Sequence, residues 1–296
     1  MAKPQKIIEG RALMPSAAIR SQMAKAMIKL IREMQADVLA EIKRVFHVEP
    51  LPEITAEDVA LRQAQEIGLL PAATHAMDAN LSELAASIIG QMTDKWQGIF
   101  DMAAMGIADR MLGATLKHSD RTVAPSLKEV SKEMTLSVSP AMKVYMDAAA
   151  QESVALIKRV PAEYLPNVQQ DVMRSITTGN GLQDLVPQLK ARNVKVRNWA
   201  ENVARDQTRK AYATVNRVRM QEAGVRKFKW VHSGGANQPR EFHMHRFPAG
   251  LNGGIFSFDE PPIIDERTGE RGFPGQLPYC GCTMSPVIEL EESDYD

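Results

Sequence analysis

Apolar residues recur at spacings of three and four along a stretch that begins near residue 16. Ser16 follows Pro15 and is a suitable N-cap for a helix. The repeat is typical of a long helix with a single apolar face, formed by Ile19, Met23, Met27, Leu30, Met34, Val38, Ile42 and Val45. A helix of this kind needs cover for that face, either from the rest of the protein or from the groove of a partner.

Helical patterns continue through the middle of the chain, separated by residues that break helices. The prolines of segment 48–53 predict a break, a helical pattern resumes near residue 55, and Pro71 interrupts it. A longer helix is expected over 80–116, followed by a turn at 118–121. These patterns favour packed helices over a β-sandwich, as does the low aromatic content of 5%.

A second set of helices is predicted between residues 139 and 223. The pattern indicates helices over 139–158, 165–176, 182–189 and 198–223. Pro161 and Pro166 are expected to separate the first two, and Pro187 to keep the third short. Two glycines in 177–181 predict a turn, and Gly224 suits the position just after a helix.

The character of the chain changes after Gly224. Phe228 and Trp230 alternate with lysines, which predicts a strand, and His232 follows on the same face. The stretch up to residue 286 is rich in Gly and Pro, and the last eight residues are acidic. The predicted fold is mainly α, with extended helical N-terminal and middle regions and a small, loop-rich C-terminal α+β module. Four regions are expected: an amphipathic helix or arm at 1–54, a helical region at 55–150, a domain at 151–288 and an acidic tail at 289–296.

The overall charge and the cysteines bear on the partners of the protein and on the compartment in which it folds. The formal net charge is zero, so no global field draws the protein to nucleic acid. Cys280 and Cys282 are too close in sequence for a stabilising disulfide, which favours a reducing compartment. Neither a signal-peptide core nor an apolar run of membrane-spanning length is apparent, so synthesis and assembly in the cytoplasm are expected.

One group of residues has the composition of a metal site. His243-x-His245 and Cys280-x-Cys282 offer two imidazoles and two thiolates, the ligand set of a closed tetrahedral zinc site. If the pairs lie in extended backbone, each would point both side chains to one face. Zinc would fasten the two ends of a module with a small core. The alternative is that these residues pack or form hydrogen bonds without a metal.

A basic segment runs from residue 190 to 229 and suits either DNA phosphates or an acidic protein surface. The candidate binding residues are Arg205, Arg209, Lys210, Arg217 and Arg219. Alternatively, acidic residues elsewhere balance a merely solvated face. Catalytic motifs such as a Walker A loop, GxSxG or HExxH are absent from the sequence. Glu241 near His243 could form an acid–base pair, but such neighbours arise easily by chance.

Residues 151–286 resemble the phage Mu F-like minor head proteins, also called phage head morphogenesis proteins. Three pieces carry this resemblance: the turn at 176–179, Ala204-Arg205-Asp206-Gln207-Thr208 through Trp230, and Arg240-x-x-His243 with the segment from Pro278 to Cys282. Gly281 departs from the family, which typically has arginine between the two cysteines.

The resemblance implies a minor capsid component of the virion. Such a protein is expected at the portal, where several copies could surround the ring, and in contact with capsid proteins and packaged or ejected DNA. It implies no catalysis. The alternative function is a small nuclease or transferase built on the C-terminal module, which would need His243 or Glu241 in an open cleft.

Overall fold

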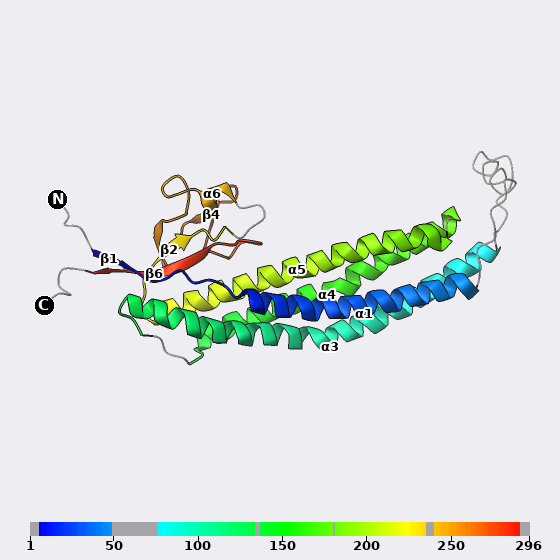
Figure 1. Cartoon of the computed structure of the whole chain (residues 1–296), viewed down its shortest axis with the longest axis horizontal. Helices are drawn as coiled ribbons and strands as arrows, with labels where there is room; N and C mark the ends of the chain where they lie inside the picture. Colours follow the sequence, from blue (N-terminus) through cyan, green and yellow to red (C-terminus); the bar gives the residue numbers. More distant parts are fainter. Residues whose placement is uncertain (1–5, 49–75, 134–136, 180, 235–239, 291–296) are drawn as a thin grey trace. The chain divides into compact units, whose positions relative to one another are not determined.

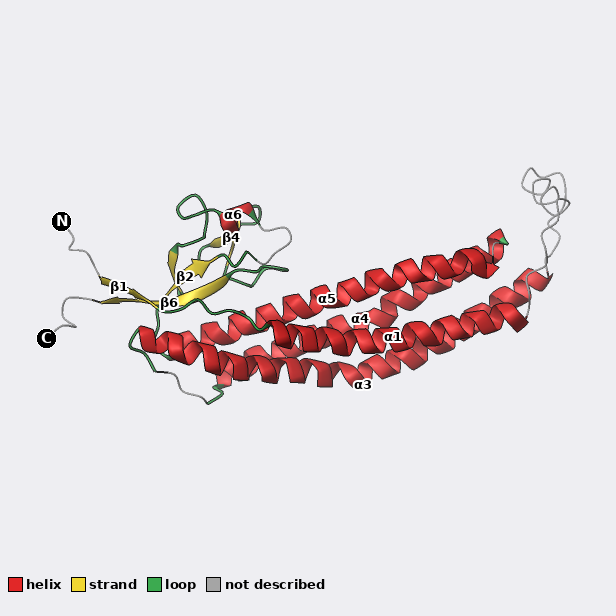
Figure 2. Ribbon diagram, in the orientation of Figure 1, coloured by secondary structure: helices red, strands yellow, loops and turns green. Residues whose placement is uncertain are grey.

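The structure is a computed structural model that describes residues 6–48, 76–133, 137–179, 181–234 and 240–290. It confirms the predicted fold class: long helices dominate, and a small antiparallel sheet lies near the C-terminus (Figure 2). The described helices are α1 (Ala17–Val48), α3 (Ala76–Glu129), α4 (Pro140–Thr178), α5 (Gly181–Glu222) and α6 (Glu241–Met244). The strands are β1 (Lys6–Glu9), β2 (Lys227–Val231), β3 (Ile255–Ser257), β4 (Ile263–Asp265), β5 (Glu270–Arg271) and β6 (Thr283–Leu290).

The contacts divide the chain into two compact units. Unit 1 comprises Met1–Lys25, Met105–Val154 and Glu201–Asp296, and unit 2 comprises Ala26–Ala104 and Ala155–Ala200. Each of the four long helices therefore contributes residues to both units. These units group residues by contact in space, and the sequence boundaries at 54, 150 and 288 stay a prediction.

Unit 2 is made of helical segments that pack side by side (Figure 1). Its core includes Met27, Ile31 and Met34 of α1, all with 0% exposure, together with Phe100 of α3 and Val172 of α4. The predicted apolar stripe of α1 is thus covered inside the protein, apart from the half-buried Leu30. This burial favours intramolecular packing over a partner's groove as the role of the stripe.

Polar contacts link the same helical segments. Asp37 of α1 accepts hydrogen bonds from Lys95 and Trp96 of α3. The Tyr164 hydroxyl of α4 donates to the Asn193 side chain of α5 at 2.6 Å. Polar pairs of this kind fix how neighbouring helices align along their lengths, because a shift by one turn would break them.

Three predicted breaks are wrong, because helices continue through them. Pro161 and Pro166 lie inside α4, and Pro187 lies inside α5. Each proline removes a backbone hydrogen bond, but apolar residues on both sides of it are buried and hold the helix together. The predicted turn at 118–121 lies inside α3, where the Ser119 hydroxyl donates to Asn216 of α5.

Other expectations of the helical part are confirmed. The turn between α4 and α5 has positive φ at Gly179 and Gly181, and Gly224 follows α5 with a φ of 75°. The helix expected over 80–116 exists and extends to residue 129. The break at 48–53 and the helical pattern near 55–71 fall mostly or wholly outside the described residues.

Unit 1 holds an antiparallel sheet with strand order β1-β6-β2-β3, and β4 and β5 form a separate pair. Phe228 and Trp230 of β2 are fully buried, as the alternation predicts. β1 is a strand that the sequence reasoning missed. The predicted tail is wrong at Glu289, which belongs to β6 and pairs with Lys227 at 2.6 Å, while residues 291–296 lie outside the described part.

The core of the C-terminal module, defined here as residues 227–290, extends beyond the module itself. Its buried residues share one cluster with residues of α3 and α5, among them Val123, Leu127, Tyr212 and Met220. Ring contacts join Phe228 to Phe256, Phe258 and Phe273. Long helices therefore supply apolar surface that the loop-rich module lacks.

Candidate metal centre

Three of the four predicted metal ligands converge. His243 comes from the one-turn helix α6, and both Cys280 and Cys282 lie just before β6. The His243 Nδ1 atom lies 3.5 Å from Cys280 Sγ and 3.8 Å from Cys282 Sγ. Ligand atoms around one tetrahedral zinc ion are separated by roughly 3.4–3.8 Å, given bonds of about 2.0–2.1 Å to nitrogen and about 2.3 Å to sulfur. The spacing therefore fits zinc.

The surroundings of His243 set which of its nitrogens faces the sulfurs. His243 Nε2 lies 2.8 Å from the backbone oxygen of Ile264. A carbonyl oxygen can only accept, so Nε2 donates its hydrogen to Ile264, and Nδ1 is the nitrogen that faces Cys280 and Cys282. Ligating histidines commonly donate their second N–H to a carbonyl in this way. The edge of the Trp230 ring contacts the same imidazole, with centroids 5.1 Å apart.

His245 does not join this cluster. It is exposed and follows the last residue of α6. The expectation that both histidines share a face rested on extended backbone, whereas successive residues of a helix turn by about 100°, so side chains two apart point away from each other. Helical backbone at His243 thus removes His245 as a ligand.

His232 lies beside one of the two cysteines, although it is not part of the compact group of His243, Cys280 and Cys282. Its Nδ1 atom is 3.6 Å from Cys282 Sγ, and the residue directly follows β2. The sequence analysis did not predict this contact, although a signal was present. His232 continues the alternation of Phe228 and Trp230, and that face of β2 is the buried one.

The cluster is closed to solvent and its thiols are coupled. His243, Cys280 and Cys282 are 2%, 4% and 7% exposed, and neither cysteine is in a disulfide. A hydrogen bond with Cys282 lowers the pKa of Cys280 to about 4, against the effect of burial. The pKa of Cys282 is raised by that same bond and by burial, with the Trp230 indole acting in the opposite direction. The opposite directions of the two pKa shifts thus share a cause, the hydrogen bond between the two sulfurs.

The aspartate of α5 ties the cysteine segment to the helices. The backbone N–H of Tyr279, a residue with a φ of 59°, donates to Asp206 Oδ1 at 2.5 Å. Asp206 also pairs with Lys210 at 3.0 Å. The backbone just before Cys280 is thus fixed by a buried carboxylate of α5.

Lys210, Arg217 and Arg219, all candidate binding residues of the basic segment, have partners within unit 1. Lys210 pairs with Glu152 as well as with Asp206. Arg217 lies over the rings of Tyr145 and Phe273, at 5.0 and 4.6 Å from their centroids. Arg219 is fully buried, with its guanidinium 2.9 Å from Asp120. The interior position of Arg219 corrects the expectation that it reaches an external phosphate, because its charge is already neutralised inside.

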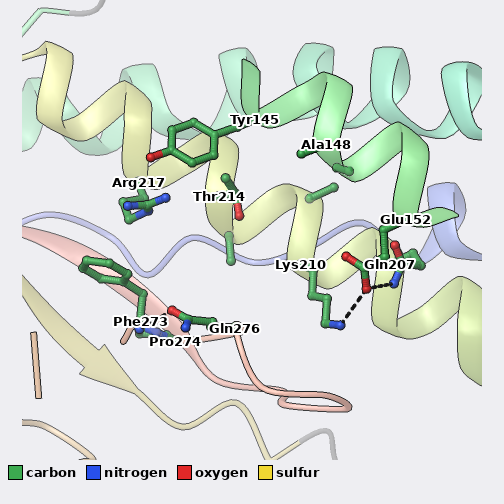
Figure 3. A pocket seen from close by; sticks show the side chains of 13 residues that line it. Tyr145, Ala148, Glu152, Gln207, Lys210, Thr214, Arg217, Phe273, Pro274 and Gln276 are labelled. Atoms are coloured by element: carbon green, nitrogen blue, oxygen red, sulfur yellow. Dashed lines mark hydrogen bonds and ion pairs between the residues drawn. The ribbon is translucent and has the colours of Figure 1, made fainter. Parts of the chain in front are cut away.

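Lys210 and Arg217 line a cavity of about 430 Å³ between α4, α5 and the loop at 273–276 (Figure 3). Glu152 accepts hydrogen bonds from Gln207 and Lys210 at one end of it. Phe273 and Tyr145 lie with Arg217 at the other end. The cavity is separate from the His–Cys cluster, since His243, Cys280 and Cys282 do not line it.

Residues 166–285 match the family described as Phage Mu protein F like protein. This Mu F-like segment contains the last third of α4, all of α5 and the module as far as the first residues of β6. The three residues of the cluster, His243, Cys280 and Cys282, lie within this segment, and so does His232. The match confirms the resemblance inferred from the sequence.

An uncharacterized protein of Haemophilus influenzae (strain ATCC 51907 / DSM 11121 / KW20 / Rd) is 29% identical over 154 residues. The alignment covers 52% of this chain and 32% of that protein, so the chain spans about a third of its relative's length. No solved structure matches the chain. Within the described residues, none of the helices is both long and apolar enough to span a membrane.

Proposed function

We propose that this protein is a minor component of a phage head, which assists head assembly by binding the portal and capsid proteins. The observation that carries the proposal is the Mu F-like match over residues 166–285. The protein would be assembled in the host cytoplasm and would remain in the virion, with several copies around the portal. Contact with packaged or ejected DNA belongs to the same proposal.

The geometry around His243 supports a structural role over the nuclease or transferase alternative. An acid–base residue must offer a ring nitrogen to substrate. Both nitrogens of His243 face protein atoms instead, Nε2 the Ile264 oxygen and Nδ1 the two sulfurs. Glu241 is exposed at the start of α6, whereas His243 is buried. The pair is therefore poorly arranged for joint catalysis.

We also propose that the metal centre binds one Zn²⁺ as a structural ion. His243, Cys280 and Cys282 would be ligands, with His232 as the fourth. Bound zinc would supply bonds between the end of β2, α6 and the start of β6, segments that are otherwise joined by loops. The donor set, the closed environment and the second hydrogen bond of His243 support this assignment.

Exposed apolar residues at and just before the start of α4 are the surface that we propose for the portal. Val144 and Tyr145 of α4 are 67% and 41% exposed, and Val138, which lies just before the helix, is 48% exposed. The apolar stripe of α1 is covered inside the protein and therefore does not offer a surface to the portal. Single exposed apolar residues are ordinary, but three on one short stretch form a contact suited to a protein partner.

Co-purification with the portal protein of the same phage tests this function. Full-length protein should capture the portal, and Val144→Glu should weaken capture about tenfold or more, because it puts a charge into an apolar contact. Gln151→Glu is the matched control, since it adds the same charge at an exposed position of α4. Failure of the unmodified protein to capture portal, together with its absence from purified virions, would refute the proposed function.

A further inference from the structure

A second cavity, of about 170 Å³, opens where α1 begins beside α5. Its wall carries three arginines and no acidic side chain; the lining residues are Met14, Pro15, Ser16, Ala17, Arg20, Arg205, Thr208, Arg209 and Ser233. A water molecule occupies about 30 Å³ in the liquid, so the cavity has room for a small polyatomic ion.

The first turn of α1 lies at this cavity. α1 is 32 residues long, and Ser16 and Ala17 at its start line the wall. The Ser16 hydroxyl accepts from the Ile19 N–H at a long 3.4 Å, so it caps the helix weakly. The first N–H groups of a helix lack intrahelical partners and carry partial positive charge, which favours an anion.

Buried polar atoms beside the cavity lack partners. Thr208 is 1% exposed and lines the wall, yet its Oγ1 atom forms no hydrogen bond, and the Nε atom of Arg205 is likewise buried without one. An unsatisfied buried donor typically costs about 1–3 kcal/mol. Both groups can therefore donate hydrogen bonds to a ligand in the cavity.

The positive charge in the cavity is concentrated. Burial lowers the pKa of Arg209, and the nearby charges of Arg205 and Arg20 lower it further, while Cys280 and Asp206 act in the opposite direction and do not outweigh them. Among the described residues, neither Arg20 nor Arg205 forms an ion pair within 4.0 Å. An anion between these side chains would relieve their mutual repulsion and would suit planar guanidinium donors.

We infer that this cavity binds a phosphate group, held by Arg20, Arg205, the Thr208 hydroxyl and the first turn of α1. The group is either free phosphate or a phosphodiester of DNA. Only the DNA source rests on the proposed function, because free phosphate could bind in a protein of any role.

Thermal unfolding of the full-length protein in sodium phosphate and in sodium chloride of equal ionic strength tests the free ion. Phosphate should raise the melting temperature of the unmodified protein. The Arg20→Gln substitution should weaken the affinity for phosphate about tenfold or more. Arg32→Gln removes the same charge from an exposed position of α1 and should leave binding unchanged.

Thr208→Val separates a ligand role from a packing role. Valine keeps the shape and removes an unsatisfied hydroxyl, so the variant should melt at or above the temperature of the unmodified protein in chloride. It should nevertheless lose most of the stabilisation by phosphate. This combination also guards against the possibility that an arginine variant fails to fold.

Fluorescence anisotropy with a short labelled DNA duplex distinguishes the two sources. If Arg20→Gln and Thr208→Val weaken DNA binding and flatten its salt dependence, the phosphodiester is the ligand. If DNA binding is absent or unchanged while the phosphate effect is lost, free phosphate is the ligand. A lack of phosphate stabilisation in the unmodified protein, with DNA binding insensitive to both variants, overturns the inference. If the two variants then weakened only the capture of portal, the ligand of the cavity would be a carboxylate of the partner. If the unmodified protein failed to capture portal but was stabilised by phosphate, the phosphate site would stand and the proposed function would not.

Discussion

Unit 2 and the C-terminal module achieve order by different means. The core of unit 2 draws on many equivalent positions along four helices, and buried residues such as Met27, Ile31 and Met34 repeat the same type of contact. The module has strands of two to eight residues, and its order depends on a few long-range contacts around Trp230 and the His–Cys cluster. Redundant packing tolerates single changes better than a cluster in which each ligand is unique.

The largest expected effect is therefore at the metal centre. Purified protein should contain one zinc per chain, and Cys282→Ser or His232→Ala should reduce that content. Structural zinc can contribute on the order of 10 kcal/mol to the folding of a small module. Hydrogen exchange in the variants should show loss of protection in β2, β3 and β6, while unit 2 stays protected.

His245→Ala is the matched control for these variants. It changes a histidine of the same region that is exposed and outside the cluster. It should leave zinc content and melting unchanged. Metal-free protein with full protection in the module would show that hydrogen bonds and packing alone hold the cluster together.

An intermediate effect is expected in the helical core. Ile31→Ala removes a side chain with 0% exposure from unit 2 and should cost about 2–5 kcal/mol, as large-to-small substitutions in cores do. Denaturant unfolding should show this loss, while zinc content remains one per chain. Arg32→Ala, its exposed neighbour, should change stability by less than about 0.5 kcal/mol. Loss of zinc in Ile31→Ala would mean that the two regions are not independently stabilised.

The same contrast explains what the sequence could predict. The apolar period of α1 and the alternation in β2 report directly on which face is buried, so both elements were predicted correctly. Pro161, Pro166 and Pro187 misled because a local cost in hydrogen bonding was outweighed by packing along the helix, which depends on residues distant in sequence.

The candidate centre was predictable in its chemistry but only partly in its geometry. Cys280, Cys282 and His243 could be chosen because thiolates and imidazoles suit zinc. That His243 joins the cysteines while His245 does not depends on one turn of helix at α6, and a four-residue element is too short to show a periodic pattern. Likewise, Arg219 pairs with Asp120 of α3 and Lys210 with Glu152 of α4, residues that lie far away in the chain.

The smallest expected effect is the contribution of Glu152 to the pH dependence of stability. Glu152 lies outside both compared regions and lines the larger cavity (Figure 3). Burial alone would raise the pKa of Glu152, but hydrogen bonds from Gln207 and Lys210 outweigh it and lower the pKa below its usual value. The ionised carboxylate therefore stabilises the fold above the usual carboxyl pKa, and this contribution is lost as the pH falls through the lowered value. Because the side chain is half exposed, solvent limits the effect to below about 1 kcal/mol.

Glu152→Gln should thus reduce stability slightly at neutral pH and flatten the decline of stability in acid. Urea unfolding between neutral pH and the acid range measures both effects. Glu163→Gln is the control, because it removes a carboxylate of α4 whose exposed partner Arg159 lies one turn away on the same helix. If Glu163→Gln flattened the acid decline as much as Glu152→Gln does, the effect would reflect general charge on α4. A difference between the two variants would assign it to the contact of Glu152 with Gln207 and Lys210, which joins α4 to α5 within unit 1.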